Sequence, residues 1–242
     1  VGLIHNSPPL SYRGYTLFST NGGDHATLVD MEGQICHRWR SDEGIGYAQL
    51  LPNGHLLFRS NPPTEEESGR GLGGASAALI ELDWDGNKVW EYRDPWIHHD
   101  YHRQLNGNTI MLIWEDLSTE VSDTVHGGIV DEEEPEVMLG DKIREIDSDG
   151  NTLNEWSLWK NLDVEVDVIC PLHDRREWTH TNSLNLTIDD NFLVSSRTTN
   201  TVSIVSRETG EYIWKWGPGE VWHQHNPTQL DNGNILMFDN GS

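Results

Sequence analysis

One hairpin pattern recurs along the chain: an apolar strand, a short turn and a second apolar strand. Asn-Gly stands in the turn at residues 53–54, 106–107 and 232–233, and residues 189–191 take the same place in a fourth copy. Asn-Gly favours positive φ at both turn positions, which makes it the strongest short-range signal of a β-hairpin. The pattern therefore predicts tight antiparallel hairpins at four places.

A second hairpin alternates with the first. Its turns end in glycines at positions 33, 86, 150 and 210, which are 53, 64 and 60 residues apart. Two hairpins per repeat make a four-stranded antiparallel unit, and a repeat of this length indicates a propeller or an array. We therefore expect an all-β fold, a β-propeller of four-stranded antiparallel blades.

The order of the strands places the histidines of the chain. Each blade should begin with the strand that precedes the Asn-Gly turn, and the first strand of a propeller blade is the innermost. Strands near 99–105, 179–186 and 224–230 should then line the channel. The channel-lining candidates are His98, His99, His180, His223 and His225.

The hairpin over residues 178–197 gives one of these histidines its partners. Folding it about the turn at 189–191 places His180 opposite Arg197, with Asn182 at the same end of the ribbon. All three side chains can donate hydrogen bonds to an oxyanion. For this hairpin alone a polar rim is the better interpretation; convergence with other inner strands favours an anion site.

We expect residues 1–242 to form a single, partial β-propeller domain. Three complete blades can be counted, with strands from about 14 to 40 before them and one hairpin after them. Closing a ring needs further strands, so we expect more chain or another subunit to complete the propeller. Residues 115–141 should form an acidic insertion loop, including Asp131–Glu134. A solvated loop is the preferred interpretation over calcium binding, because no EF-hand spacing is present.

The charge of the chain excludes some partners. Forty acidic residues face sixteen basic ones, for a net charge of −24. Nucleic acid and anionic membrane surfaces would be repelled.

No run of 18 apolar residues indicates a membrane span, and Val1 does not begin a signal peptide; a mature exported protein would look the same. A disulfide between Cys36 and Cys170 is conceivable, and their spacing does not suggest zinc.

Four motifs resemble the bacterial and archaeal arylsulfotransferase family, and the resemblance extends from about residue 12 to 241. They are Gly14–Phe18, His98–Asp100, Trp178–Asn182 and Trp216–His225. The resemblance implies a six-bladed propeller that is exported to the periplasm or the cell exterior. It also implies transfer of a sulfuryl group from an aryl sulfate to a phenol through a sulfohistidine, with no nucleotide sulfate donor and no cofactor.

The resemblance also suggests roles for individual residues. His180, Asn182 and Arg197 match the sulfate-binding cluster of the family, and His99 matches a further channel histidine. His225 is the best match to the nucleophile, although His223 is a second candidate for that role. We expect His180, His99 and Arg197 to act with His225 in catalysis, and Asn182, His98 and His223 to bind substrate, with no metal ligand among them. The acidic insertion after Trp114 departs from the family pattern.

The chemistry of the residues agrees with this assignment in outline. A neutral imidazole is a good nucleophile near pH 7, because its ordinary pKa is about 6.5. Arg197, Asn182 and a second histidine could stabilise the sulfate oxygens, while a protonated histidine donates to the leaving phenolate. The chain has no Gly-x-x-x-x-Gly-Lys loop to hold a nucleotide donor.

Three other functions remain open at this point. The histidines with Asp100 could bind zinc or copper, since His-x-His places two imidazoles on one strand face. A channel with histidine, arginine and Tyr101 could also serve a polysaccharide lyase, with histidine as the base. The propeller could instead bind partners without any chemistry, because a fold does not fix a function.

Overall fold

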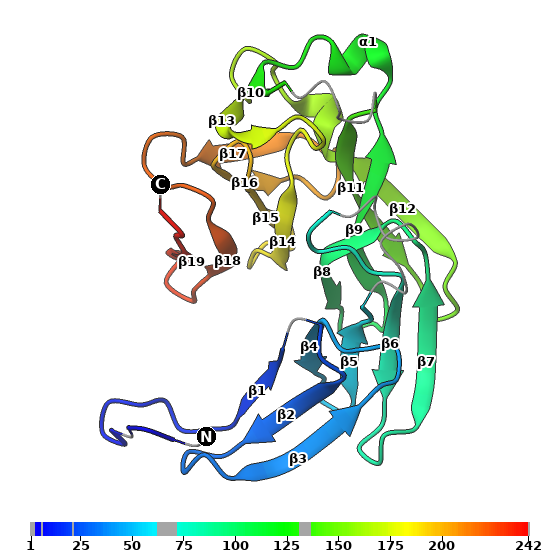
Figure 1. The fold of residues 1–242 in the computed structure, drawn as a ribbon, viewed down its shortest axis with the longest axis vertical. Helices are drawn as coiled ribbons and strands as arrows, with labels where there is room; N and C mark the ends of the chain where they lie inside the picture. The colour runs from blue at the N-terminus through cyan, green and yellow to red at the C-terminus, as the bar shows by residue number, and fades with distance from the viewer. Residues whose placement is uncertain (1–2, 6, 21, 62–71, 131–136, 242) are drawn as a thin grey trace. The chain divides into compact units, whose positions relative to one another are not determined.

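The structure is a computed structural model that describes residues 3–5, 7–20, 22–61, 72–130 and 137–241. The chain divides into two compact units, residues 1–96 and residues 97–242. Each unit consists mainly of antiparallel sheets whose strands follow one another in the chain (Figure 1).

Unit 1 holds a three-stranded and a four-stranded sheet among its described residues, each in chain order. The first sheet contains β1 (Thr16–Ser19), β2 (His25–Val29) and β3 (Ile35–Arg40). The second contains β4 (Tyr47–Leu50), β5 (Leu56–Arg59), β6 (Ala78–Leu82) and β7 (Lys88–Arg93). The first strands of the two sheets, β1 and β4, are neighbours, as expected for innermost strands of adjacent blades.

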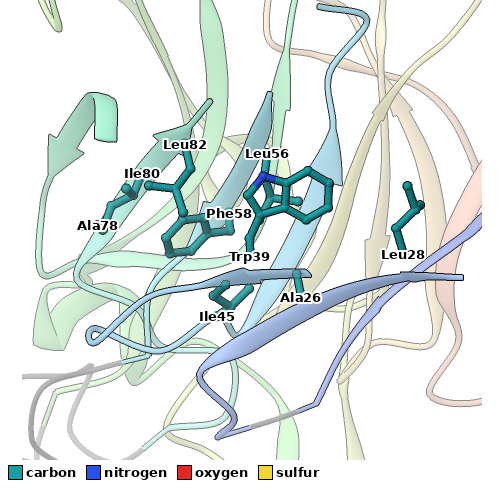
Figure 2. Close-up of a cluster of buried hydrophobic side chains, with 9 residues drawn as sticks. All are labelled: Ala26, Leu28, Trp39, Ile45, Leu56, Phe58, Ala78, Ile80 and Leu82. Carbon is teal, nitrogen blue, oxygen red and sulfur yellow. The ribbon is translucent and has the colours of Figure 1, made fainter. Parts of the chain in front are cut away.

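A buried apolar cluster joins the two sheets of unit 1. Figure 2 shows its side chains, which come from β2, β3, β5, β6 and the segment before β4. Trp39 is its largest member and is almost fully buried, and its indole N–H donates to the backbone oxygen of Asp83 at 3.0 Å. A buried indole that finds an acceptor adds its large apolar area without leaving a polar group unsatisfied. The members are Ala26, Leu28, Trp39, Ile45, Leu56, Phe58, Ala78, Ile80 and Leu82.

Unit 2 holds two four-stranded sheets and a two-stranded one of the same antiparallel kind. The first sheet has the order β12-β11-β9-β8, with β8 (Ile97–Arg103), β9 (Thr109–Asp116), β11 (Leu139–Ile146) and β12 (Thr152–Ser157). The second contains β14 (Thr181–Leu186), β15 (Phe192–Ser196), β16 (Thr201–Val205) and β17 (Tyr212–Trp216). The hairpin contains β18 (His225–Gln229) and β19 (Ile235–Phe238).

The first strands of these sheets are again neighbours: β14 lies between β8 and β18 (Figure 1). The prediction that strands near 99–105, 179–186 and 224–230 are innermost is thereby confirmed, as is the all-β propeller class with four-stranded antiparallel blades. The core between the two four-stranded sheets is built mainly from alternate residues of their strands, and Leu158 comes from the short helix that follows β12. Its buried members are Ile110, Leu112, Ile143, Leu158, Leu184, Phe192, Val194 and Val205.

Short elements outside the sheets support one end of unit 2. They are α1 (Thr119–Ser122), β10 (Gly127–Ile129), the 3-10 helix η2 (Leu158–Asn161) and β13 (Ile169–Asp174). β10 and β13 pair in parallel, a small exception to the antiparallel pattern that the sequence did not indicate. None of the helices in the described part of the chain is long and apolar enough to cross a membrane.

The acidic insertion expected over 115–141 is shorter at both ends. Glu115 and Asp116 lie on β9, and Asp141 lies on β11. The connection between the two strands therefore covers 117–138, and Asp131–Glu134 lies outside the described residues. The difference matters for Asp141, because its side chain is only 1 % exposed and does not belong to a solvated loop.

The turn geometry corrects the expectation of positive φ at both Asn and Gly. Gly54 has φ 84°, whereas Asn53 is not among the residues with positive φ. The Gly54 N–H donates to Leu51 O at 2.9 Å, and the Leu51 N–H donates to His55 O at 2.8 Å. This is a type I turn followed by one left-handed residue. In the fourth copy Asp190, with φ 61°, occupies the left-handed position.

Candidate functional site

Three of the expected site histidines have a left-handed backbone. His99, His180 and His223 have φ values of 44°, 44° and 54°, and they lie within or just before the innermost strands of unit 2. A residue other than glycine rarely adopts such a φ, and the conformation costs on the order of 1 kcal/mol or more. Strain of this kind often gathers at functional sites, which makes the three positions candidates for a functional role.

The predicted pairing of His180 with Arg197 is confirmed. The Arg197 N–H donates to His180 O at 3.2 Å, and the next pair of the ladder is Thr181 with Ser196. The register then shifts so that Ser183 pairs with Ser195. Asn182 is the extra residue of this β-bulge, a device that often redirects a side chain next to an active site.

His180 forms an ion pair with a carboxylate that the sequence did not single out. Its Nδ1 lies 2.5 Å from Glu177 Oε2, and the indole N–H of Trp114 donates to Glu177 Oε1 at 2.7 Å. Burial alone would lower the pKa of His180, but the negative charge of Glu177 and its hydrogen bond outweigh burial and raise it. The raised pKa favours the protonated form of His180, which can donate a proton.

Two further histidines surround the same pair. The ring of His98 is fully buried and stacks on Trp114, with 4.5 Å between centroids and 7° between planes. His98 Nδ1 lies 3.0 Å from His99 Nδ1, and the rings of His99 and His180 are in edge contact at 4.5 Å. The structure thus brings His98, His99 and His180 together, as expected for the channel histidines.

Asp141 supplies a second buried carboxylate beneath these rings. Its Oδ1 lies 3.4 Å from His98 Nε2, while its Oδ2 accepts hydrogen bonds from the hydroxyl of Thr179 and from the Thr181 N–H. Burial and the nearby charge of Glu177 raise the pKa of Asp141 to about 6. The hydrogen bonds fix the start of β14, and the carboxylate positions the His98 ring.

Arg197 faces a histidine that the sequence analysis missed. Its Nη1 lies 3.0 Å from Nδ1 and 3.2 Å from Nε2 of His173, on β13. Burial, followed by the positive charge of Arg197, lowers the pKa of His173 to about 4, so this imidazole is neutral. The His173 and His223 rings are in edge contact at 4.7 Å, and Cys170 Sγ lies 3.9 Å from His223 Nε2.

His225 begins β18, and its ring nitrogen Nδ1 lies 3.2 Å from Asn240 Oδ1. An oxygen acceptor at Nδ1 places the ring proton there and leaves the lone pair on Nε2. Burial lowers the pKa of His225, and the positive charges of Arg197 and His180 act in the same direction. His225 is thus within electrostatic reach of both residues.

Asn182 has a contact within the protein as well as the substrate role expected for it. Its Nδ2 donates to Gln224 O at 2.9 Å, which links β14 to the segment before β18, and the side chain is buried. Gln224 in turn donates to Ser195 Oγ at 3.1 Å and to Thr201 O at 3.0 Å. This network fixes the peptide between His223 and His225.

Contacts of two residues bear on the other functions that the sequence left open. Both carboxylate oxygens of Asp100 accept backbone N–H groups, from Tyr101 at 2.9 Å and Leu184 at 2.8 Å. Asp100 therefore joins β8 to β14 and is not a good zinc ligand. Tyr101 is fully buried, which removes the tyrosine that a lyase would need at the channel surface.

Cys36 and Cys170 are both free thiols, so no disulfide joins them.

Most of the residues that sequence reasoning missed come from loops and short strands. Glu177 is three positions before His180, and this spacing was the one signal that could have revealed it. Asp141 was counted with the insertion. His173 and Asn240 gave no signal, because their positions depend on how β13 and the end of β19 pack. Among the described residues, Cys170, His173 and His223 form a group whose donor atoms all lie within 4.8 Å of one another, a separation that a metal ion could bridge.

Solved structures with the same fold have very different sequences. A protein of unknown function from Bacteroides caccae is 13% identical, with a TM-score of 0.54. The match covers 93% of this chain and 66% of the Bacteroides protein. A streptogramin B lyase is 13% identical (TM-score 0.54, 97% of this chain and 60% of its own), and the virginiamycin B lyase of Staphylococcus aureus is 11% identical (TM-score 0.53, 95% and 61%). The chain therefore spans less than two thirds of these proteins. At such identities the likeness shows the fold alone.

No curated protein matches the chain. The arylsulfotransferase (ASST) family, by contrast, matches residues 9–224 of the chain. This is most of the sequence and includes the innermost strands β8 and β14. The match agrees with the motifs, the strand order and the gathered histidines. The chain belongs to the arylsulfotransferase family.

Proposed function

We propose that the protein transfers a sulfuryl group from an aryl sulfate to a phenol through a sulfohistidine on His225. Membership of the family supports this reaction class. The observation that carries the mechanism is the buried pair of His180 and Glu177, which favours the protonated form of an imidazole next to His99 and opposite Arg197. Such a group can donate a proton to a leaving phenolate.

In the first step Nε2 of His225 attacks the sulfur of the aryl sulfate. The bond between sulfur and the aryl oxygen breaks, and the phenolate takes the proton of His180. The guanidinium of Arg197 and the His99 ring balance the charge on the sulfate oxygens. His225 suits this role because its Nδ1 faces Asn240 Oδ1, which leaves the lone pair on Nε2.

In the second step a phenol attacks the sulfohistidine. The nitrogen–sulfur bond breaks, the new aryl sulfate leaves, and the neutral His180 takes the proton of the attacking hydroxyl. His180 thus changes from acid to base and returns to its starting form, so no cofactor is consumed. His98, Asn182 and His223 would shape the binding site around these groups, His98 through its stacking on Trp114.

Intact-protein mass spectrometry with 4-nitrophenyl sulfate tests the proposal. We expect release of 4-nitrophenol and addition of one sulfuryl group, which peptide mapping locates on His225. His225→Ala should lose labelling and turnover by a thousandfold or more, as removal of a nucleophile does in other enzymes. His25 lies on β2 of unit 1 and is not part of the proposed site, so His25→Ala serves as the control. Labelling on His223 would reassign the nucleophile, and full turnover by the His223→Ala, His225→Ala double variant would reject histidine catalysis. The assay requires the full-length protein.

We also propose that the protein works in the periplasm or outside the cell. Family membership supports this location. Fractionation of cells that express the complete gene product should recover it outside the cytoplasm, and recovery with cytoplasmic enzymes would contradict the proposal.

A further inference from the structure

We propose that Cys170, His173 and His223 form a zinc site, with the thiolate and two imidazoles as protein ligands and a fourth position open. All three donor atoms lie within 4.8 Å of one another. Cys170 Sγ and His223 Nε2 are 3.9 Å apart. Zinc–sulfur and zinc–nitrogen bonds of about 2.3 Å and 2.0–2.1 Å at a tetrahedral angle need a separation close to this. Only small side-chain movements are required.

The backbone fixes two of the ligands before any ion arrives. Cys170 is buried, and its N–H donates to Thr198 O at 2.7 Å. The His223 N–H donates to Asn200 Oδ1 at 2.9 Å, and the left-handed backbone at His223 turns its ring toward β13. A site assembled in this way loses little conformational entropy on binding.

The donor set favours zinc over harder cations. One thiolate with two imidazoles resembles the sets that hold Zn²⁺, whereas Mg²⁺ and Ca²⁺ prefer oxygen ligands. Three protein ligands leave one position for water or for an anionic oxygen. The site uses neither His180 nor His225, so ion binding can be measured apart from the proposed transfer, although it shares His223 and the neighbouring Arg197 with the proposed substrate site.

Arg197 competes with the ion for one ligand. Its Nη1 lies 3.0 Å and 3.2 Å from the two ring nitrogens of His173, so the guanidinium must turn away when zinc occupies the site. The side chain is long and only partly buried, which makes that movement feasible. Loss of Arg197 should therefore tighten zinc binding, the opposite of what the loss of a ligand does.

Cobalt substitution tests the site directly. The chain has two cysteines, so a Cys36→Ser background leaves Cys170 as its single thiol. Co²⁺ added to this protein should give a sulfur-to-cobalt charge-transfer band and the visible bands of a tetrahedral ion, with one equivalent bound and displaced by Zn²⁺. Cys170→Ser should abolish the charge-transfer band. His223→Asn, which tolerates a positive φ, should weaken Zn²⁺ binding by roughly a hundredfold or more, because even outer-shell changes cost about 10–100-fold.

Two controls separate this site from adventitious binding by a chain with 12 histidines. His25→Ala, on β2 of unit 1, should bind Zn²⁺ with unchanged affinity, and Arg197→Ala should bind it more tightly. Circular dichroism of each variant verifies that the sheets are intact. The proposal is overturned if folded Cys170→Ser retains the charge-transfer band or the full Zn²⁺ affinity, or if cobalt gives only an octahedral spectrum.

Discussion

The two units solve the same backbone problem with different residues. The first hairpin of a blade opens at a residue whose N–H donates to the backbone oxygen four residues later: Leu51, Thr187 and Leu230. Seven positions before these residues stand Gly44 in unit 1 and His180 and His223 in unit 2. All three have positive φ: 74°, 44° and 54°. Glycine adopts this conformation without strain, whereas histidine does so at a cost. The conformation recurs seven positions before Leu51, Thr187 and Leu230. Before the hairpin that Gln104 opens, the seventh position is Ile97, which is not among the residues with positive φ, and the left-handed residue is His99 instead. In unit 2 the left-handed residue is therefore an imidazole, at a cost in strain.

The side chains that surround these positions also differ between the two units. Gly44 lines a hollow of about 510 Å³ with Asp24, Asp42, Glu43 and Arg93, in which Arg93 and Glu43 are bonded at 2.8 Å. A Cβ at Gly44 would meet the side chain of Asn61, so there is no space for a larger residue at this position. In unit 2 the corresponding positions carry rings that contact other histidines. Under the proposed mechanism, this difference places the chemistry in unit 2.

The largest expected effect comes from making unit 2 resemble unit 1 at one position. His180→Gly should remove the proton donor and lower the turnover of 4-nitrophenyl sulfate by roughly 10²–10⁴-fold, the contribution of a general acid. Strain is relieved by the same change, so the sheets should stay folded by circular dichroism. Turnover close to that of the wild-type protein would show that His180 is structural and that the comparison does not locate the chemistry.

The converse change in unit 1 should act on stability alone. Gly44→Ala places a Cβ 2.1 Å from Asn61 Nδ2 at a backbone φ of 74°, and Asn61 would lose its 3.2 Å bond to Gly23 O. The strain and the lost hydrogen bond together should lower the free energy of unfolding by about 2 kcal/mol in chemical denaturation. Gly86→Ala, at φ 85° with open space around it, is the control that carries only the backbone strain. Equal losses in the two variants would show that Asn61 does not restrict this position.

Sequence reasoning predicted what depends on local turns and failed where distant loops meet. The strand order and the pairing of His180 with Arg197 follow from turn positions, because an antiparallel register is fixed by the residue at its turn. Asn-Gly marked the turns correctly but predicted the wrong turn type. His173 was missed because its side chain is placed by β13 and the pairing of that strand with β10. Glu177 was missed because its segment is held to Leu139 at the start of β11. No repeat indicates either contact.

Glu177 offers a test of the imidazole at position 180, because its negative charge raises the pKa of His180. Glu177→Gln can keep an oxygen for the indole N–H of Trp114 but removes the charge that raises the pKa of His180. The alkaline limit of turnover should then move to lower pH, with little change below it. His180 stabilises the folded protein fully below its ordinary pKa of about 6.5, and this stability is lost as pH rises through the raised value.

Thermal unfolding across pH is the second readout of this variant. The wild-type protein should lose stability above pH 6.5 more steeply than Glu177→Gln does. Asp141, whose raised pKa is about 6, titrates between about 3.8 and 6 and affects a lower window. An unmoved alkaline limit would assign the proton donor to a residue other than His180.

The smallest expected effect tests the strain itself. Alanine and glycine at position 180 remove the same imidazole, so the difference between them isolates the backbone. With φ 44°, His180→Gly should be more stable than His180→Ala by about 1 kcal/mol, and the same sign should hold at His223 with φ 54°. His225 begins a strand and is not among the residues with positive φ, so there glycine should be less stable than alanine by about 0.5–1 kcal/mol. Denaturant midpoints of the six variants provide the measurement. If glycine were the less stable residue at all three positions, the left-handed conformation would carry no cost, and the histidines of unit 2 would need no functional reason to stand where unit 1 has glycine.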